Sequence, residues 1–298
     1  MLMTLPAAAG WAEAEAPLRG VTNAVTGLTR FAGCTLVPTD WADGDSFRVK
    51  FPDGEERTIR LYGADCLERH VRDDSDARRL REQRRYFGMT KAGGSAQESI
   101  RRAKEFGTAA WEFVQEELEG KFTVHTAWAD GRGDARYKRF YGFVETADGK
   151  DLAERLVEAG LARAYGVYRR KAADVSRDEY RARLADRELT AAKRGIGAWA
   201  ATDWASLPEE RRLQREEDAE IQAAKDGGGG LPAGKSIDPN TASRDELMQL
   251  PGIGETMALR IMESREEAKF RKAEDLRRVP GIGAKTVEKM AAYLRFGP

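Results

Sequence analysis

The sequence predicts an α+β protein: strands and helices of a first region pack around one small sheet or barrel, and a separate all-α region follows. Three observations carry this prediction. Short β-rich segments come first and are separated by turn signals, helical patterns follow them, and a short motif near the carboxyl terminus is repeated. The 298 residues are enough for two domains.

Composition narrows the class of protein. Charged residues make up 34%, hydrophobic residues 41%, and the mean hydropathy is −0.62. No apolar run reaches about 18 residues, so no membrane span is expected. Lys plus Arg number 50, as do Asp plus Glu, so any charge preference for a partner must be regional. Two Cys and two His exclude a zinc ribbon and an HExxH protease site, whereas one Cys34–Cys66 bridge is permitted by count.

Five segments are expected to form strands, because β-branched and aromatic residues gather in them: Thr35–Val37, Ser46–Phe51, Arg57–Tyr62, Phe122–Ala127 and Arg139–Val144. Asp53-Gly54 predicts a hairpin turn between the second and third, since this pair accepts a positive φ. Three segments carry apolar residues three and four positions apart, as helices do: Phe106–Leu118, Leu152–Ala159 and Arg177–Lys193.

Composition changes near Leu207. A charged stretch, Pro208–Lys225, leads into four consecutive glycines (227–230), which favour a flexible linker. We therefore expect four parts: an N-terminal segment (1–30), a first domain (31–201), a charged helix with the linker (202–234) and a second domain (235–298).

The N-terminal segment bears on localisation. Met1–Ala14 is apolar and rich in Ala, and the first basic residue is Arg19. This pattern is similar to a secretory signal that lacks its charged start, so residues 1–30 could be the remnant of a signal peptide. A secreted or periplasmic location is slightly favoured over a cytoplasmic one.

The second domain contains an internal repeat. Leu250-Pro-Gly-Ile-Gly254 returns 29 residues later as Val279-Pro-Gly-Ile-Gly283, and its apolar flanks return with it. Each unit predicts a helix, a tight turn and a second helix, with Ile253 and Ile282 pointing inward. Ser243 and Glu246 match a capping box at the start of the first helix.

Acids and arginines gather in three short segments of the first domain: Asp43-Gly44-Asp45, Arg60–Glu68 and Tyr137-Lys138-Arg139. Two carboxylates suit a hard cation such as Ca²⁺, and a third acid can deprotonate water. Two guanidinium groups can bind a phosphate whose charge grows in the transition state. Singly, each acid is typical of a turn or a surface, and each arginine of a surface ion pair. Together, in this order, they predict phosphodiester hydrolysis.

These motifs resemble the staphylococcal (thermonuclease) nuclease family. The resemblance spans roughly Phe31–Ala201 and includes Asp148–Ala162 and Lys193–Trp199. It implies an OB-type five-stranded β-barrel with packed helices that hydrolyses DNA and RNA with Ca²⁺ and leaves a 3′-phosphate. Nucleic acid is the expected partner, and a monomer is the expected state.

Transferred position by position, the resemblance implies roles for single residues. Asp45 and Asp65 become the Ca²⁺ carboxylates, and Cys66 contributes its backbone carbonyl. The implied catalytic residues are Glu68, which directs water, and the phosphate clamp Arg60 and Arg139.

Aromatic residues complete the implied site. Tyr137, Tyr165 and Tyr168 are similar to the family's nucleotide-contacting aromatics, although Tyr165 and Tyr168 are one residue further apart than in the best-known member. Leu67 stands where the family usually has Pro, which removes a fixed φ beside Glu68. We expect an altered rate from this departure and not a loss of activity.

The segment Arg69–Lys104 is longer than the equivalent family loop. It holds eleven Lys or Arg against five Asp or Glu. Two interpretations are open: a solvated helical or disordered insertion, or a basic arm that follows phosphates beside the active site.

The doubled Pro-Gly-Ile-Gly unit resembles the tandem helix-hairpin-helix domain of competence DNA-receptor proteins, starting at Ile237–Ser243. This resemblance implies DNA binding without sequence preference. The candidate DNA contacts are Gly252, Ile253, Gly254, Gly281, Ile282, Gly283 and Lys285. Twelve Lys or Arg against ten Asp or Glu predict modest, salt-sensitive affinity. A protein-interaction module is the alternative.

The leading hypothesis is a Ca²⁺-dependent nuclease that acts on DNA and possibly RNA, with a tethered DNA-binding tail. The alternative is a non-catalytic DNA-receptor or scaffold protein with a degenerate nuclease domain. Retention of both metal acids argues for the enzyme, because a domain that only binds has no need of them.

Overall fold

The computed structural model describes residues 20–131, 138–226 and 236–297. The segment 1–19, on which the signal-peptide expectation rests, and the four glycines of the expected linker lie outside the described residues. Within the described ranges, no helix combines the length and the apolar character needed to cross a bilayer.

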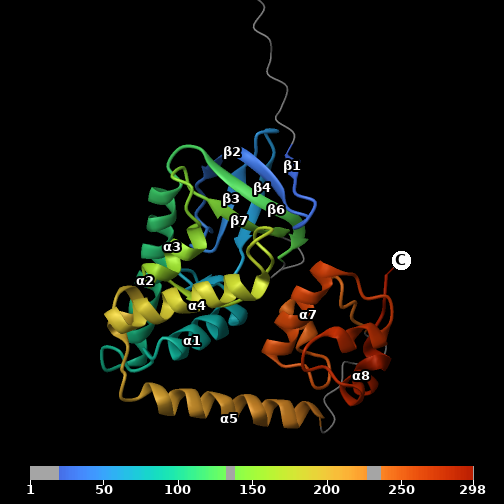
Figure 1. Cartoon of the computed structure of the whole chain (residues 1–298). Coiled ribbons are helices and arrows are strands. Elements are labelled where there is room, and N and C mark those ends of the chain that lie inside the picture. Colours follow the sequence, from blue (N-terminus) through green and yellow to red (C-terminus); the bar gives the residue numbers. More distant parts are fainter. Residues whose placement is uncertain (1–19, 132–137, 227–235, 298) are drawn as a thin grey trace, which may run out of the picture.

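Six strands form one sheet that closes on itself (Figure 1). Its order is β1-β2-β3-β4-β7-β6, and β2 also pairs with β6. The strands are β1 (Val21–Thr22), β2 (Thr29–Val37), β3 (Ser46–Lys50), β4 (Glu56–Leu61), β6 (Phe122–Asp130) and β7 (Arg139–Glu145). The pair β4–β7 is parallel, and the others are antiparallel. The β2–β6 pairing closes five strands into a barrel, and β1 extends the sheet beside β2. The predicted α+β class and the five-stranded barrel are confirmed.

Two short strands lie outside this barrel. β5 (Ala64–Cys66) and β8 (Ala162–Ala164) pair antiparallel, with Asp65 directly opposite Arg163. Neither was predicted, because three residues are too few to show an alternating pattern.

The β3–β4 hairpin sets the register of the site. Gly54 has a φ of 85°, as the Asp-Gly turn predicts. Ser46 then lies opposite Arg60, and Leu61 N donates to Asp45 O at 2.9 Å. The start of β3 and the end of β4 are thereby held together.

The helices before the tail domain are α1 (Asp74–Tyr86), α2 (Ala96–Glu117), α3 (Leu152–Glu158), α4 (Arg177–Arg194), the 3₁₀ helix η1 (Gly197–Ala201) and α5 (Leu207–Asp226). In Figure 1, α2 and α3 lie beside the barrel and α1 and α4 below it, whereas α5 lies below α1, away from the strands. α2 starts ten residues before the predicted helix, because the Ser95 side chain caps it by accepting from Glu98 N. The basic insertion is helical as well: the Asp73 side chain caps α1 by accepting from Ser75 N and Asp76 N.

The tail domain is all-α. It contains α6 (Arg244–Leu247), α7 (Glu255–Glu267), η2 (Ala273–Arg278), α8 (Ala284–Met290) and η3 (Ala291–Tyr293). Gly252 and Gly281 have φ values of 76° and 93°, so both repeats use a left-handed glycine in the turn. Ile253 and Ile282 are buried, as predicted. The second repeat departs from prediction in one respect: its first helix is a 3₁₀ helix.

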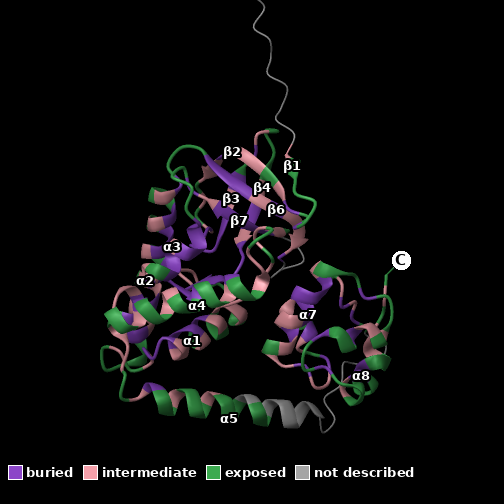
Figure 2. Cartoon of the chain, viewed as in Figure 1, coloured by how far each residue is buried: buried purple, intermediate pink, exposed green. Residues whose placement is uncertain are grey.

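Buried side chains of the barrel and of the tail belong to one contiguous apolar cluster. Figure 2 shows the buried residues in the barrel strands and along α7. Cys34 and Cys66 are both buried and both free thiols, so they do not form the bridge that their number permits. Burial raises the pKa of Cys34 to about 12, which makes this thiol inert at neutral pH.

α2 packs against the backbone that follows β5. A Cβ at Gly107 would lie 2.4 Å from the Leu67 carbonyl oxygen and 2.9 Å from Arg69 N. Glycine therefore permits the close approach of α2 to the segment that carries Glu68.

We expect Gly107→Ala to destabilise the protein by about 1–3 kcal/mol, because the added methyl group must displace backbone atoms. Helix propensity alone would favour Ala by about 1 kcal/mol. Urea unfolding measures the difference. Thr108→Ala, an exposed position one residue further along α2, is the control and should change stability by less than about 0.5 kcal/mol. A more stable Gly107→Ala variant would contradict this packing.

Candidate active site

Two buried carboxylates flank one arginine. Arg60, on β4, donates from Nη1 to Asp45 Oδ1 at 3.2 Å and from Nη2 to Asp65 Oδ1 at 3.0 Å. Asp45 precedes β3 and Asp65 lies in β5, and each is 5% exposed. The Asp45 Oδ2 atom also accepts from Cys66 N at 2.9 Å. The structure thus brings Asp45, Asp65, Cys66 and Arg60 together as the sequence predicts.

Asp65 has two further donors. Its Oδ2 atom accepts from Arg163 Nε at 2.8 Å and from Gln83 Nε2 at 3.0 Å. Burial opposes ionisation of Asp65, but the guanidinium groups of Arg163 and Arg60 outweigh it and hold its pKa at about 2. Asp65 is therefore a carboxylate throughout the physiological range.

Glu68 and Asp43 behave in the opposite way. Burial raises the pKa of Glu68 to about 8, although Arg79, whose Nε lies 3.1 Å from Glu68 Oε1, opposes the shift. Burial and the charge of Asp45 raise the pKa of Asp43 to about 7. Among the described residues, no hydrogen-bond partner reaches the buried Asp43 Oδ1. The site therefore contains carboxyl groups that repel one another, which favours a proton or a cation between them.

Arg139 begins β7 beside β4. In the parallel register Thr58 lies opposite Arg139 and Arg60 opposite Tyr141, so Arg60 and Arg139 lie on the same face of neighbouring strands. Burial lowers the pKa of Arg139, and so do the nearby charges of Arg60 and Arg79. Within the described part of the chain, Arg139 makes no ion pair with an acid. Its guanidinium is therefore available to an anion.

Several of these groups line one cavity of about 810 Å³. The first domain contributes acids, arginines and aromatic residues to its wall: Asp43, Arg60, Asp65, Glu68, Arg79, Arg139, Tyr141 and Tyr165. The tail contributes the opposite wall: Ser243, Arg244, Asp245, Glu246, Leu259 and Met262. The cavity is therefore built by both domains.

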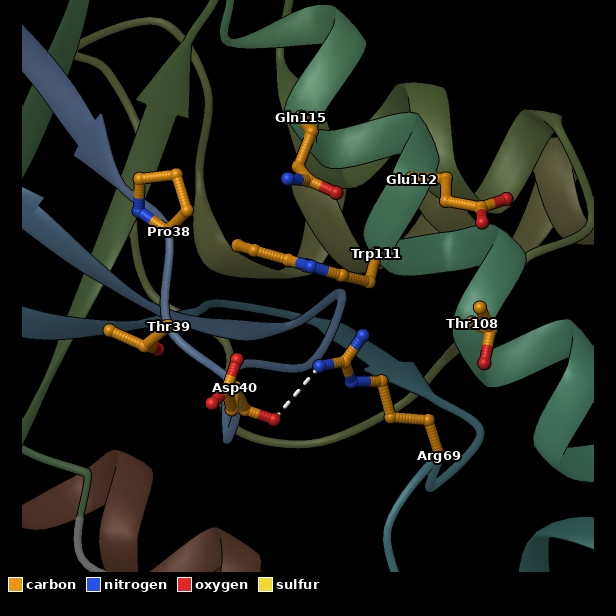
Figure 3. Close-up of a pocket in the computed structure, with 8 residues that line it drawn as sticks. All are labelled: Pro38, Thr39, Asp40, Arg69, Thr108, Trp111, Glu112 and Gln115. Atoms are coloured by element: carbon orange, nitrogen blue, oxygen red, sulfur yellow. Dashed lines mark hydrogen bonds between the residues drawn. The ribbon is translucent and has the colours of Figure 1, made fainter.

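A second pocket, of about 340 Å³, lies between α2 and the segment before β3 (Figure 3). Arg69 Nη2 donates to the Asp40 carbonyl oxygen there at 2.9 Å. None of the predicted site residues lines this pocket. The larger cavity is therefore the candidate active site.

Comparison with known proteins agrees with this geometry. Residues 58–201 match the family model described as staphylococcal nuclease homologue, and residues 232–295 match the model described as helix-hairpin-helix motif. The chain joins a staphylococcal nuclease-like OB-fold domain to a helix-hairpin-helix domain.

One curated relative is ComE operon protein 1 of Bacillus subtilis (strain 168). It is 36% identical over 81 residues, which are 25% of this chain and 40% of that protein. The match therefore spans about two fifths of the relative's length.

The structure separates the predicted tyrosines of the nuclease-like domain. Tyr165 lines the cavity, and its ring centre lies 4.0 Å from the Arg163 guanidinium carbon. Tyr168 is 6% exposed and does not line the cavity, and its ring packs against Tyr180 and Arg181. Tyr137 lies outside the described residues. Of the two predicted tyrosines that the structure describes, Tyr165 lies where a nucleotide could reach it and Tyr168 does not.

Sequence reasoning missed three residues of the site. Gln83 and Arg79 come from α1, inside the insertion, and Arg163 comes from β8. The signal was present for the first two, because positions 79 and 83 are four apart and lie on one face of a helix. The insertion is a helix that supplies side chains to the site.

The helix-hairpin-helix domain is docked and not merely tethered. On α7, Glu266 Oε2 accepts from the Tyr62 hydroxyl at 2.8 Å and pairs with Arg169 Nη1 at 2.7 Å. Glu263 Oε1 accepts from Tyr168 N at 3.1 Å and pairs with Arg181 Nη2 at 2.7 Å. Both carboxylates are almost fully buried, so their partners hold the tail wall of the cavity in place.

We expect Glu266→Ala to release the tail, because Arg169 and Tyr62 would otherwise stay buried without their partner, at a cost of about 3–5 kcal/mol. Small-angle scattering should show a larger radius of gyration, and unfolding should separate into two transitions. Glu267→Ala is the control. It removes an exposed pair with Arg177, worth about 0–1 kcal/mol. Equal radii for wild type and Glu266→Ala would contradict the docking role.

Proposed function

We propose that this protein is a Ca²⁺-dependent nuclease that hydrolyses phosphodiester bonds of DNA, with RNA as a further substrate. The proposal rests above all on one observation: Glu68, Asp65 and the guanidinium of Arg139, which makes no ion pair with another described residue, line one cavity. The nuclease-like and helix-hairpin-helix domains both indicate a nucleic-acid partner. An anionic diester would meet positive charge at Arg139 and a proton acceptor at Glu68.

The donor set suits Ca²⁺. Asp45, Asp65 and the Cys66 carbonyl supply only oxygen atoms, which hard cations prefer, and the orphaned Oδ1 of Asp43 adds another. When bound, Ca²⁺ would neutralise charge on the phosphate. The described residues hold no ready cluster of three or more His, Cys, Asp or Glu, so the cation would be bound through few carboxylates and further oxygens.

Different residues of the site perform different steps of the hydrolysis. Water gives a proton to Glu68, the water oxygen bonds to phosphorus, and the bond to the sugar oxygen breaks as that oxygen leaves and takes up a proton from solvent. In its ionised form Glu68 is a stronger base than an exposed carboxylate, because burial raises its pKa. Arg139 and the remaining N–H groups of Arg60 donate to phosphate oxygens as their charge grows.

The helix-hairpin-helix domain supports the same proposal by holding the polymer. The second turn, with Gly281, Gly283 and Lys285, is exposed, whereas the first turn is only partly exposed beside the nuclease-like domain. Phosphates would approach the exposed turn first at Gly283, where no atom lies within 4 Å of the position that a Cβ would take. Holding the polymer there raises the local substrate concentration at the cavity.

A non-catalytic DNA receptor is the second candidate. One observation favours it: Arg60 already occupies both Asp45 and Asp65, so the carboxylates are satisfied without a metal ion. An assay of DNA cleavage separates the two candidates.

We expect wild type to cut plasmid and single-stranded DNA with Ca²⁺ and to stop in EDTA. Glu68→Gln should lower the rate by about 10²–10⁴ and Arg139→Ala by about 10²–10³, because each removes an interaction made in the transition state. Arg30→Ala, an exposed arginine on β2, is the matched control and should cut normally. Wild type that binds DNA but cuts nothing with any metal ion would establish the receptor instead.

We expect Lys285→Ala to weaken binding of long duplex DNA in EDTA and to reduce the slope of log K against log salt concentration by about 0.9, the loss of one phosphate contact. Fluorescence anisotropy across a salt series measures both. Lys121→Ala, an exposed lysine of the nuclease-like domain, serves as the control. An unchanged slope would show that the second turn does not contact phosphate.

A further inference from the structure

Helix α1 places one uncharged polar side chain in the middle of the acidic site. Gln83 is 1% exposed and makes three hydrogen bonds. Its Nε2 donates to Asp65 Oδ2 at 3.0 Å and to the Cys66 carbonyl oxygen at 2.7 Å. Its Oε1 accepts from Glu68 N at 3.0 Å. One amide thus contacts three of the groups on which the proposed chemistry depends.

The bonding pattern fixes the orientation of this amide. Asp65 Oδ2 and the Cys66 carbonyl can only accept, so the NH₂ group must face them, and Glu68 N can only donate, so the oxygen must face it. Both N–H donors are used. A flipped amide would place its oxygen against two acceptor oxygens and its NH₂ group against the Glu68 N–H. Gln83 is therefore held in a single arrangement.

Part of the backbone that it contacts lies outside regular secondary structure. β5 ends at Cys66, and residues 67–73 belong to no helix or strand. Without Gln83, the buried Glu68 N–H and the Cys66 carbonyl would each lose a hydrogen bond, which is costly for a buried group. The direction of the Glu68 side chain depends on this backbone.

A second residue of the same helix face acts beside it. Arg79 lies one turn before Gln83 and pairs with the Glu68 carboxylate. Leu80 is buried beneath the helix, and Arg85 pairs with Glu217 of α5. α1 is therefore anchored on both sides while it presents Arg79 and Gln83 to the site.

We propose that Gln83 is a positioning residue of the nuclease site: it holds the Asp65 carboxylate and the Cys66 carbonyl as oxygen donors for the cation and fixes the backbone that aims Glu68. Gln83 does not line the cavity, so it acts through these three residues and does not touch the substrate. The inference rests on the proposed function.

Gln83→Met tests the proposal, because it keeps the length of the side chain and removes every hydrogen bond. Calorimetry on the full chain without DNA should show Ca²⁺ affinity about 10- to 100-fold weaker than that of wild type. At saturating Ca²⁺, kcat should fall by a similar factor, whereas KM for DNA should stay within about twofold. A residue that only supports the fold would lower the melting temperature and leave both the Ca²⁺ affinity and the kcat of the folded protein unchanged.

Two further variants complete the experiment. Gln83→Asn keeps the amide but is one methylene shorter, so it should lose part of the Ca²⁺ affinity and serves if Gln83→Met does not fold. Gln97→Met makes the same change at an exposed position of α2 and should behave as wild type. Wild-type Ca²⁺ affinity and kcat in Gln83→Met or Gln83→Asn would overturn the positioning role while the proposed function stands. If wild type neither binds Ca²⁺ nor cuts DNA, the positioning role and the proposed function are both wrong.

Discussion

The buried carboxylate of Asp65 is the constraint on which the site depends. A charge with 5% exposure must be paired, and here three separate elements supply the partners. Arg60 comes from β4, Arg163 from β8 and Gln83 from α1. Satisfying one carboxylate therefore fixes the barrel, the small β5–β8 sheet and the insertion helix relative to each other. Arg60 also donates a hydrogen bond to Asp45, so it holds the two carboxylates close to each other.

The junction between the domains also depends on buried carboxylates that need charged or polar partners. Glu263 and Glu266 of α7 are buried against arginines and a tyrosine of the nuclease-like domain, and burying them is favourable only while those partners are in place. Docking brings part of the tail to the cavity as a second wall. The helix-hairpin-helix domain thus contributes to the shape of the site as well as to polymer binding. A flexible tether alone would not do this.

Much of the site was predictable because its residues stand in short, ordered motifs. Asp45, Arg60, Asp65 and Glu68 fall within 24 positions of each other, on or close to the two strands that their β-rich composition and the Asp-Gly turn already predict. Gln83 and Arg163 were not predictable in the same way. Glutamine in a basic segment is typical of a solvated helix, and Arg163 faces Asp65 only because β8 pairs with β5 across 98 positions of chain. Tyr168 shows the converse, since its motif is present but its ring is in the core.

The sequence by itself determined the α+β class, the strands of the barrel, the glycine turns of the repeat and the residue types that the chemistry requires. Each of these depends on contacts or backbone preferences within a few residues, which a pattern records directly. Tertiary structure alone decided that the insertion helix enters the site, that the two thiols stay apart, and that the tail docks over the cavity. These outcomes depend on how buried charges find partners far away in the chain, and local patterns carry no record of that pairing.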